Sequence, residues 1–144
     1  YPAEIVGVIS NRPDAEGLEK ARALNIPALL IDHRHYASRE AFEQDLHDKL
    51  VSLEAELVCC AGFMRVLTPW FVSRWKNRLL NIHPSLLPAF GGKGYYGAHV
   101  HEAVLSSGLE QSGCTVHFVD DQYDHGPVLL QLAMWSCGRH EVVC

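Results

Sequence analysis

Short apolar runs alternate with segments of helical periodicity along most of this chain, and this alternation is the strongest constraint on its fold. Runs rich in Val, Ile and Leu predict strands at 5–9, 28–31, 56–61, 79–83, 114–119 and 127–133. Apolar residues at helical spacing predict helices at 15–24, 38–53, 69–76 and 98–107. Strands that alternate with helices are typical of α/β proteins, so we predict a mostly parallel sheet with helices on both faces.

The predicted helices carry signals at their starts. Ser38 and Thr68 are candidate N-caps, because a hydroxyl there accepts a hydrogen bond from the first turn, and Pro69 suits the first helical position. Asp14 is placed to cap the helix at 15–24 in the same way. The buried face of the longest helix is predicted to consist of Phe42, Leu46, Leu50 and Leu53.

Composition is typical of a soluble globular protein of one domain. The 144 residues are 48% hydrophobic and 20% charged, which is enough to bury a core. The net charge of -5 and the lack of a lysine or arginine cluster argue against nucleic acid as a partner. No apolar run approaches the roughly 18 residues that a membrane span needs, so no membrane association is expected.

The five cysteines do not follow the pattern of a disulfide framework. Their number is odd, and Cys59 and Cys60 are neighbours in one predicted strand, where their side chains face opposite ways. We interpret the cysteines as small buried residues that stay reduced in a cytoplasm.

The strand at 79–83 ends with two polar side chains. Asn81 and His83 are two residues apart, so they face the same side of the strand. Pro84 removes a backbone donor and Pro88 restricts the chain again, so the strand is predicted to end at His83. Ligands of open α/β sheets bind at the carboxyl ends of strands. An uncharged donor beside a group that titrates near neutrality suits a reaction that forms an oxyanion and needs a proton.

An acidic turn follows the strand at 114–119. If that strand lies beside 79–83, Asp124 would orient the imidazole of His83 and raise its pKa. An ordinary turn residue before Gly126 is the competing interpretation of Asp124, and the residues alone do not decide between the two.

The other histidines give weaker signals. His117 faces the opposite side of its strand from its apolar neighbours, which fits a partner of the site or a packed core residue, and core packing is slightly favoured. His99 and His101 are two apart on a helix and do not share a face, so no metal site is predicted. The glycine-rich stretch 91–97 lacks a phosphate-loop pattern and is interpreted as a mobile flap beside the site.

Three motifs in this order resemble the phosphoribosylglycinamide formyltransferase family: residues 61–67 (AGFMRVL), 80–88 (LNIHPSLLP) and 113–119 (GCTVHFV). The similarity extends from about residue 4 to about residue 132. It implies a Rossmann-like formyltransferase fold and transfer of a formyl group from 10-formyltetrahydrofolate to the amino group of glycinamide ribonucleotide, in purine biosynthesis. The implied partners are these two small molecules, and no metal, nucleic acid or membrane partner is expected. The implied location is the cytoplasm, and the oligomeric state is left open.

The resemblance also implies roles for individual residues. Asn81, His83 and Asp124 match the family's catalytic trio, in which the amide and the protonated imidazole stabilise the oxyanion and the carboxylate holds the ring. Arg39 matches a residue near the benzoyl-glutamate end of the folate, where a guanidinium would pair with a carboxylate. The residues implied to bind the pterin or to close its pocket are Met64, Arg65, Val66, Leu67, Val119, Asp120 and Asp121.

The chain departs from the family's pattern at both ends. No strand with a phosphate-binding turn precedes Tyr1, and residues 134–144 do not match the family's helix with its lysine and glutamate. We therefore divide the chain into a partial catalytic domain at 1–133 and a divergent tail at 134–144. The first strand would lie in the middle of the sheet, so we expect this chain to be poorly stable and weakly active or inactive.

Other functions compete with the transferase. A 10-formyltetrahydrofolate deformylase would use the same trio to give the formyl group to water. A noncatalytic folate-binding remnant stays open because the phosphate-binding segments are missing. Methionyl-tRNA formyltransferase is a weaker alternative, because the acidic charge of the chain disfavours tRNA.

Overall fold

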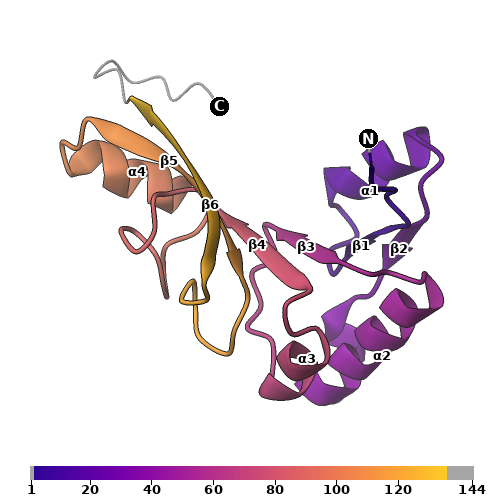
Figure 1. Cartoon of the computed structure of the whole chain (residues 1–144). Coiled ribbons are helices and arrows are strands. Elements are labelled where there is room, and N and C mark those ends of the chain that lie inside the picture. The colour runs from indigo at the N-terminus through magenta and orange to yellow at the C-terminus, as the bar shows by residue number, and fades with distance from the viewer. Residues whose placement is uncertain (1, 136–144) are drawn as a thin grey trace. The chain divides into compact units, whose positions relative to one another are not determined.

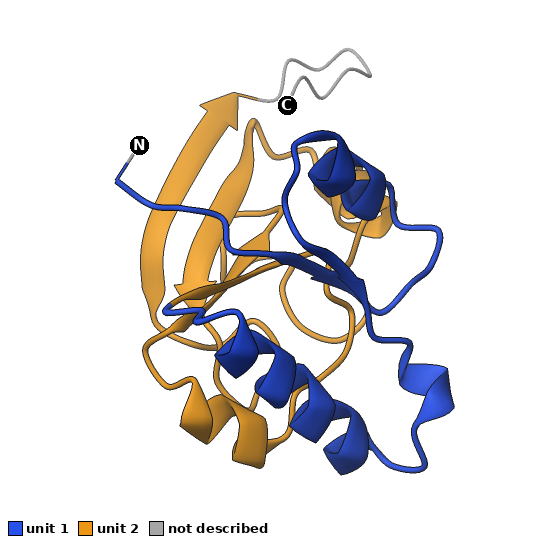
Figure 2. Ribbon diagram, turned by 90° about the vertical axis from the view of Figure 1, so that its right-hand side faces the viewer, with its two compact units in different colours: residues 1–56 blue, residues 57–144 orange. Residues whose placement is uncertain are grey.

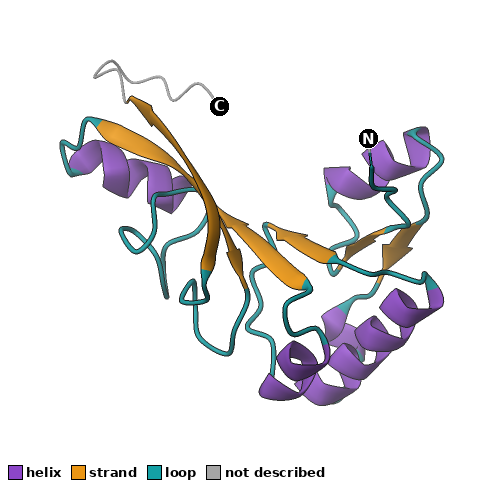
Figure 3. Ribbon diagram, viewed as in Figure 1, coloured by secondary structure: helices purple, strands orange, loops and turns teal. Residues whose placement is uncertain are grey.

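The computed structural model describes residues 2–135. The chain divides into two compact units, residues 1–56 and 57–144 (Figure 2). Short strands alternate with helices in both units (Figures 1 and 3). The predicted α/β class is therefore confirmed.

The first unit is built on a pair of parallel strands. β1 (Val8–Ser10) pairs with β2 (Ala28–Leu30), and α1 (Glu16–Ala23) lies between them in the sequence. A 3₁₀ turn (His33–His35) then leads to α2 (Arg39–Ser52). The parallel pairing with an intervening helix is the βαβ arrangement that the sequence predicts.

Two of the three predicted caps are present. The hydroxyls of Ser38 and Thr68 each accept a hydrogen bond from the backbone N–H three residues further on. The third prediction was wrong, because Ala15 is the N-cap of α1 and makes no side-chain hydrogen bond. The carboxylate of Asp14 instead pairs with the guanidinium of Arg12 in the preceding turn.

Helix α2 buries the face that its periodicity predicts. Phe42, Leu46 and Leu50 are buried. Leu53 follows the last turn, is half-buried and packs against Gly7, where a Cβ would lie 2.8 Å from its Cδ1. The absence of a side chain at Gly7 therefore makes room for the end of this apolar face.

The second unit contains one sheet in the order β3-β4-β5-β6 (Figure 1). Its strands are β3 (Val58–Ala61), β4 (Leu79–His83), β5 (Gln111–Phe118) and β6 (Val128–Trp135). β3 and β4 are parallel and are connected through α3 (Pro69–Arg74). α4 (Ala98–Ser106) precedes β5.

β5 and β6 extend this sheet with antiparallel pairings, in contrast to the parallel direction predicted for most of the sheet. The connection between β5 and β6 spans residues 119–127 and holds no helix. Parallel neighbours need a crossover of roughly a dozen residues or more, so a turn of this length requires the antiparallel direction. β6 continues through Trp135, into the segment that the sequence analysis assigned to the tail; residues 136–144 of that tail lie outside the described residues.

The described cysteines are free thiols, and Cys60 and Cys114 are half-buried rather than fully buried. Cys59 is exposed, which corrects the prediction that it is buried, because its side chain points away from the packed face of β3. Cys60 faces the other way, and burial, with a smaller effect of the neighbouring Cys59, raises its pKa to about 12. Cys137 and Cys144 lie outside the described residues.

Candidate active site

The register of β4 with β5 determines what surrounds the two polar side chains at the end of β4. Asn81 lies opposite His117, and His83 lies opposite Thr115. His83 is 4% exposed and Asn81 is half-buried, and both line one cavity. The strand ends at His83, the residue before Pro84, as predicted.

The carboxylate of Asp124 lies between two imidazoles. Its Oδ1 is 3.5 Å from Nδ1 of His83 and 3.6 Å from Nε2 of His117. Its Oδ2 accepts a hydrogen bond of 2.9 Å from the backbone N–H of Gly92. Asp124 has a φ of 50°, a left-handed conformation that aspartate adopts more readily than most residues. The structure thus brings Asp124 to His83, and it connects Asp124 to Asn81 through His117.

His83 is surrounded by groups that favour its charged form. Nε2 donates to the carbonyl oxygen of Phe90 at 2.7 Å, while Nδ1 faces the Asp124 carboxylate. Burial by itself lowers the pKa of His83, but the contacts with Asp124 and with the Phe90 carbonyl outweigh it, so the pKa is raised. An imidazole with acceptors at both nitrogens is best satisfied as an imidazolium, which donates twice.

Asp124 is held in its ionised form. Burial opposes ionisation, but hydrogen bonds from His117, from His83 and from the Gly92 N–H outweigh it and hold the pKa of Asp124 well below its usual range. Both shifts favour a carboxylate that faces an imidazolium at the end of β4. Such a pair keeps a proton and a positive charge beside whatever occupies the cavity.

His117 belongs to the site, although core packing was the slightly favoured interpretation of the sequence. It is buried, but its polar atoms are all engaged: Nδ1 donates to the Phe118 carbonyl at 2.9 Å, and Nε2 lies 3.2 Å from Nδ2 of Asn81. A neutral ring accepts the amide hydrogen of Asn81 at Nε2, and a protonated ring donates to Asp124. His117 thus orients the Asn81 amide when its ring is neutral, or the Asp124 carboxylate when its ring is protonated. Its position on the face of β5 opposite the apolar residues was the available signal.

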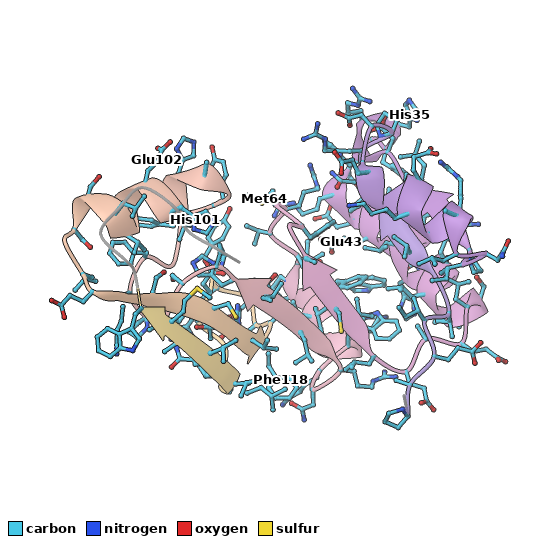
Figure 4. All side chains as sticks on the ribbon, turned by 90° about the horizontal axis from the view of Figure 1, so that it is seen from above. His35, Glu43, Met64, His101, Glu102 and Phe118 are labelled. Atoms are coloured by element: carbon cyan, nitrogen blue, oxygen red, sulfur yellow. The ribbon has the colours of Figure 1, made fainter. Side chains whose placement is uncertain are left out.

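The cavity beside these residues has a volume of about 1010 Å³. Loop residues 62–67 line one part of it, including Met64, Arg65, Val66 and Leu67, which the resemblance assigns to the folate. Val119 and Asp120 line another part, whereas Asp121 is exposed and is not among the lining residues. Met64 of loop 62–67 and His101 of α4 are labelled in Figure 4, and both contribute to the same cavity. Arg39 begins α2 in the first unit, and its assigned role stays a prediction.

The glycine-rich loop 91–97 lies beside the site, as expected, between β4 and α4 (Figure 3). Lys93, Tyr95 and Tyr96 line the cavity, and the ring of Tyr95 meets that of Phe90 edge to face. The structure adds two groups that sequence reasoning missed, the Phe90 carbonyl and the Gly92 N–H. Both belong to the backbone, so no residue type could have indicated them.

No arrangement for a metal ion or a membrane span is found in the part of the chain that the structure describes. Within residues 2–135, no group of three or more His, Cys, Asp or Glu side chains is suited to hold a metal ion. His99 faces Glu102 at 3.7 Å and the ring of Tyr96. None of the helices described combines the length and the apolar content needed to cross a membrane.

Comparisons with known proteins agree on one family. The family model described as formyl transferase matches residues 1–135. The chain is 50% identical over 129 residues to the trifunctional purine biosynthetic protein adenosine-3 of Chironomus tentans, covering 90% of this chain and 9% of that protein. It is 46% identical over 124 residues to phosphoribosylglycinamide formyltransferase of Escherichia coli, covering 86% of this chain and 56% of that protein.

A solved structure gives the same result. Phosphoribosylglycinamide formyltransferase of Coxiella burnetii, in complex with CHES, matches with a TM-score of 0.86 and 39% identity, covering 96% of this chain and 63% of that one. The chain belongs to the formyl transferase family. Its similarity is to phosphoribosylglycinamide formyltransferases within that family, and it spans about half the length of the Escherichia coli relative.

Proposed function

We propose that this chain is the folate-binding and catalytic part of a phosphoribosylglycinamide formyltransferase, which transfers a formyl group from 10-formyltetrahydrofolate to the amino group of glycinamide ribonucleotide in purine biosynthesis. The observation that carries this proposal is the position of His83 between Asp124 and the Phe90 carbonyl, beside Asn81. The names of the relatives supply formyl transfer, the phosphoribosylglycinamide acceptor and purine biosynthesis. The formyl-folate donor is what the resemblance to the family implies.

The geometry supports attack of an amine on a formyl carbon held in this cavity. The amine nitrogen forms a bond to the formyl carbon, and the carbonyl oxygen becomes an oxyanion. Asn81 carries two amide hydrogens, and only one is engaged by His117, so the other is available to the oxyanion. The imidazolium of His83 supplies positive charge next to it, since its hydrogens face Phe90 and Asp124.

The reaction ends when the bond between the formyl carbon and N10 of the folate breaks and a proton passes from the amine to N10. Asp124 supports this step by keeping His83 protonated and by fixing its ring. The apolar side chains of loop 62–67 provide the walls for the pterin, and the cavity volume of about 1010 Å³ suits a ligand of this size. Absence of a metal, a cytoplasmic location and independence from nucleic acid remain predictions from the sequence.

The test is turnover of 10-formyltetrahydrofolate with and without glycinamide ribonucleotide, with His83→Gln as the inactive control. Turnover that requires the amine, and that is lost in the variant, supports the transferase. Turnover of equal rate without the amine would instead identify a deformylase. Binding of the folate with no turnover under either condition, by this chain and by one extended with the family's terminal segments, would identify a noncatalytic remnant. Both of these outcomes overturn the proposal.

A further inference from the structure

A buried hydroxyl group on β5 organises the segment that follows β4. Thr115 is 0% exposed and lies opposite His83 in the β4–β5 pairing. Its Oγ1 donates to the carbonyl of Ser85 at 2.7 Å and accepts from the backbone N–H of Leu87 at 3.0 Å. A third hydrogen bond of 3.0 Å arrives from Nε2 of Gln131 on β6. One donor and two acceptor sites are all that a hydroxyl offers, so its hydrogen-bonding capacity is fully used.

Two further hydrogen bonds, one from Gln131 and one from Ser85, complete this network. Nε2 of Gln131 also donates to the carbonyl of Leu87 at 2.8 Å. The hydroxyl of Ser85, which is 1% exposed, donates to the carbonyl of Ala89 at 2.6 Å. Residues 85–89 are thus held to β5 and β6 by side chains, although this segment belongs to neither strand.

The network ends beside the backbone groups that contact the candidate catalytic pair. Phe90 follows Ala89 directly, and its carbonyl accepts the Nε2 hydrogen of His83. Gly92 lies two residues further on and donates its N–H to Asp124. Phe90 has a φ of 53°, a costly conformation for a bulky residue, so its carbonyl keeps this direction only where the flanking chain is fixed.

We propose that Thr115 and Gln131 are positioning residues for His83, acting through segment 85–89 to hold the Phe90 carbonyl against the imidazole. Neither side chain is within hydrogen-bond distance of the imidazole itself, so their effect is transmitted through this segment. The role of His83 in the reaction rests on the proposed function, but the effect on its ionisation does not.

The other ionisable groups near His83 come from several elements and are unchanged by the variants below. Asp124 faces the ring from the turn after β5, and His117 of β5 shares that carboxylate. The remaining ionisable side chains that line the cavity are Cys60, Arg65, Lys93, Tyr95, Tyr96, His101, Cys114, Asp120 and Tyr123. A change in the titration of His83 on replacing Thr115 or Gln131, which carry no charge, is therefore a change in its hydrogen bonding.

The test compares Thr115→Val with Thr115→Ser, and adds Gln131→Met. Valine keeps the shape of threonine but removes the hydroxyl, whereas serine keeps it. The titration of His83 is followed by NMR of its ring protons in the full chain. We expect its pKa to fall in T115V and Q131M and to stay at the wild-type value in T115S. We also expect kcat to fall about tenfold or more in T115V, with KM for the folate within about twofold of wild type.

The outcomes separate this inference from the proposed function. A fall in the pKa of His83 in the variants, with no formyl transfer by wild type or by any variant, would support the positioning role and contradict the proposed function. Formyl transfer by wild type, with unchanged His83 titration in T115V and Q131M, would overturn the positioning role alone. If T115V does not fold, Q131M decides, because Gln131 lies on an exposed part of β6 and its loss leaves no buried cavity.

Discussion

Nδ1 of His83 lies 3.5 Å from Oδ1 of Asp124, and this contact connects the end of β4 to the turn after β5. The opposite nitrogen of the same ring donates to the Phe90 carbonyl. The ring is thus held between a charged and a neutral acceptor, and it is this arrangement, rather than either residue alone, that the proposed transfer reaction requires.

Replacement of Asp124 by Asn is expected to lower the pKa of His83 and to reduce kcat about 100-fold or more, the range of general acid–base contributions. Asparagine also tolerates the left-handed conformation at this position, so the backbone of the turn is preserved. NMR titration of His83 and steady-state kinetics measure both effects. A variant that keeps the wild-type pKa of His83 would contradict the ion pair.

The ion pair predicts a pH optimum for folding stability. The pKa of Asp124 is lowered in the folded state, so its contribution is present above the unfolded value of about 4 and is lost as the pH falls through the folded pKa. The pKa of His83 is raised, so its contribution is full below about 6.5 and is lost as the pH rises through the folded pKa.

The difference in free energy of unfolding between wild type and D124N should therefore be largest between about pH 4 and about pH 6.5. Urea unfolding of both proteins over a series of pH values measures it. A difference that does not change with pH would show that the pair is not ionised in the folded protein.

His117 is expected to matter for activity as well as for packing. Substitution by Leu removes the partner of the Asn81 amide and the imidazole that lies 3.6 Å from the Asp124 carboxylate, so kcat should fall about tenfold or more, with a changed pH profile. Val116→Ala, next to it on the other face of β5, provides the matched control. It should lower the free energy of unfolding without changing the pH profile, and an identical profile in both variants would assign His117 to packing alone.

Gly126 is expected to reject any side chain. A Cβ there would lie 1.8 Å from the carbonyl oxygen of Phe118, so alanine forces the turn that carries Asp124 to move. We expect G126A to lose about 1–3 kcal/mol of unfolding free energy together with most activity. Gly17 is the control, because no atom lies within 4 Å of its Cβ position in α1, and G17A should gain about 0.5–1 kcal/mol. Thermal unfolding followed by circular dichroism compares them; equal stability of G126A and wild type would refute the clash.

The sequence predicted the elements best where side-chain pattern and chain restriction agree. β4 has the predicted bounds because an apolar run is stopped by Pro84. The cap assigned to Asp14 was wrong because a nearby Arg12 competes for the carboxylate, a local choice that spacing does not reveal. The pattern did not predict the antiparallel direction of β5. A helix precedes β5, and strands that follow a helix are usually parallel to the strand before it.

The site was predictable only as far as side chains carry the chemistry. Asn81, His83 and Asp124 are of types that indicate proton transfer and oxyanion binding, and the structure gathers them with His117. The Phe90 carbonyl is a backbone group, and every residue type has one. Its direction follows from the hydrogen bonds that Thr115 makes to segment 85–89, and a threonine in a strand does not by itself indicate a catalytic site.

The alignment of β4 with β5 places His117 and Thr115 on alternate positions of a single strand, across from Asn81 and His83. One residue inserted into either strand would turn both partners to the opposite face of the sheet, because side chains alternate along a strand. The amide contact and the anchor of the following segment would then disappear in the same event. A length change within these two strands therefore removes both contacts at once unless a bulge takes up the extra residue, as the register shift between Val116 and His117 does opposite β6.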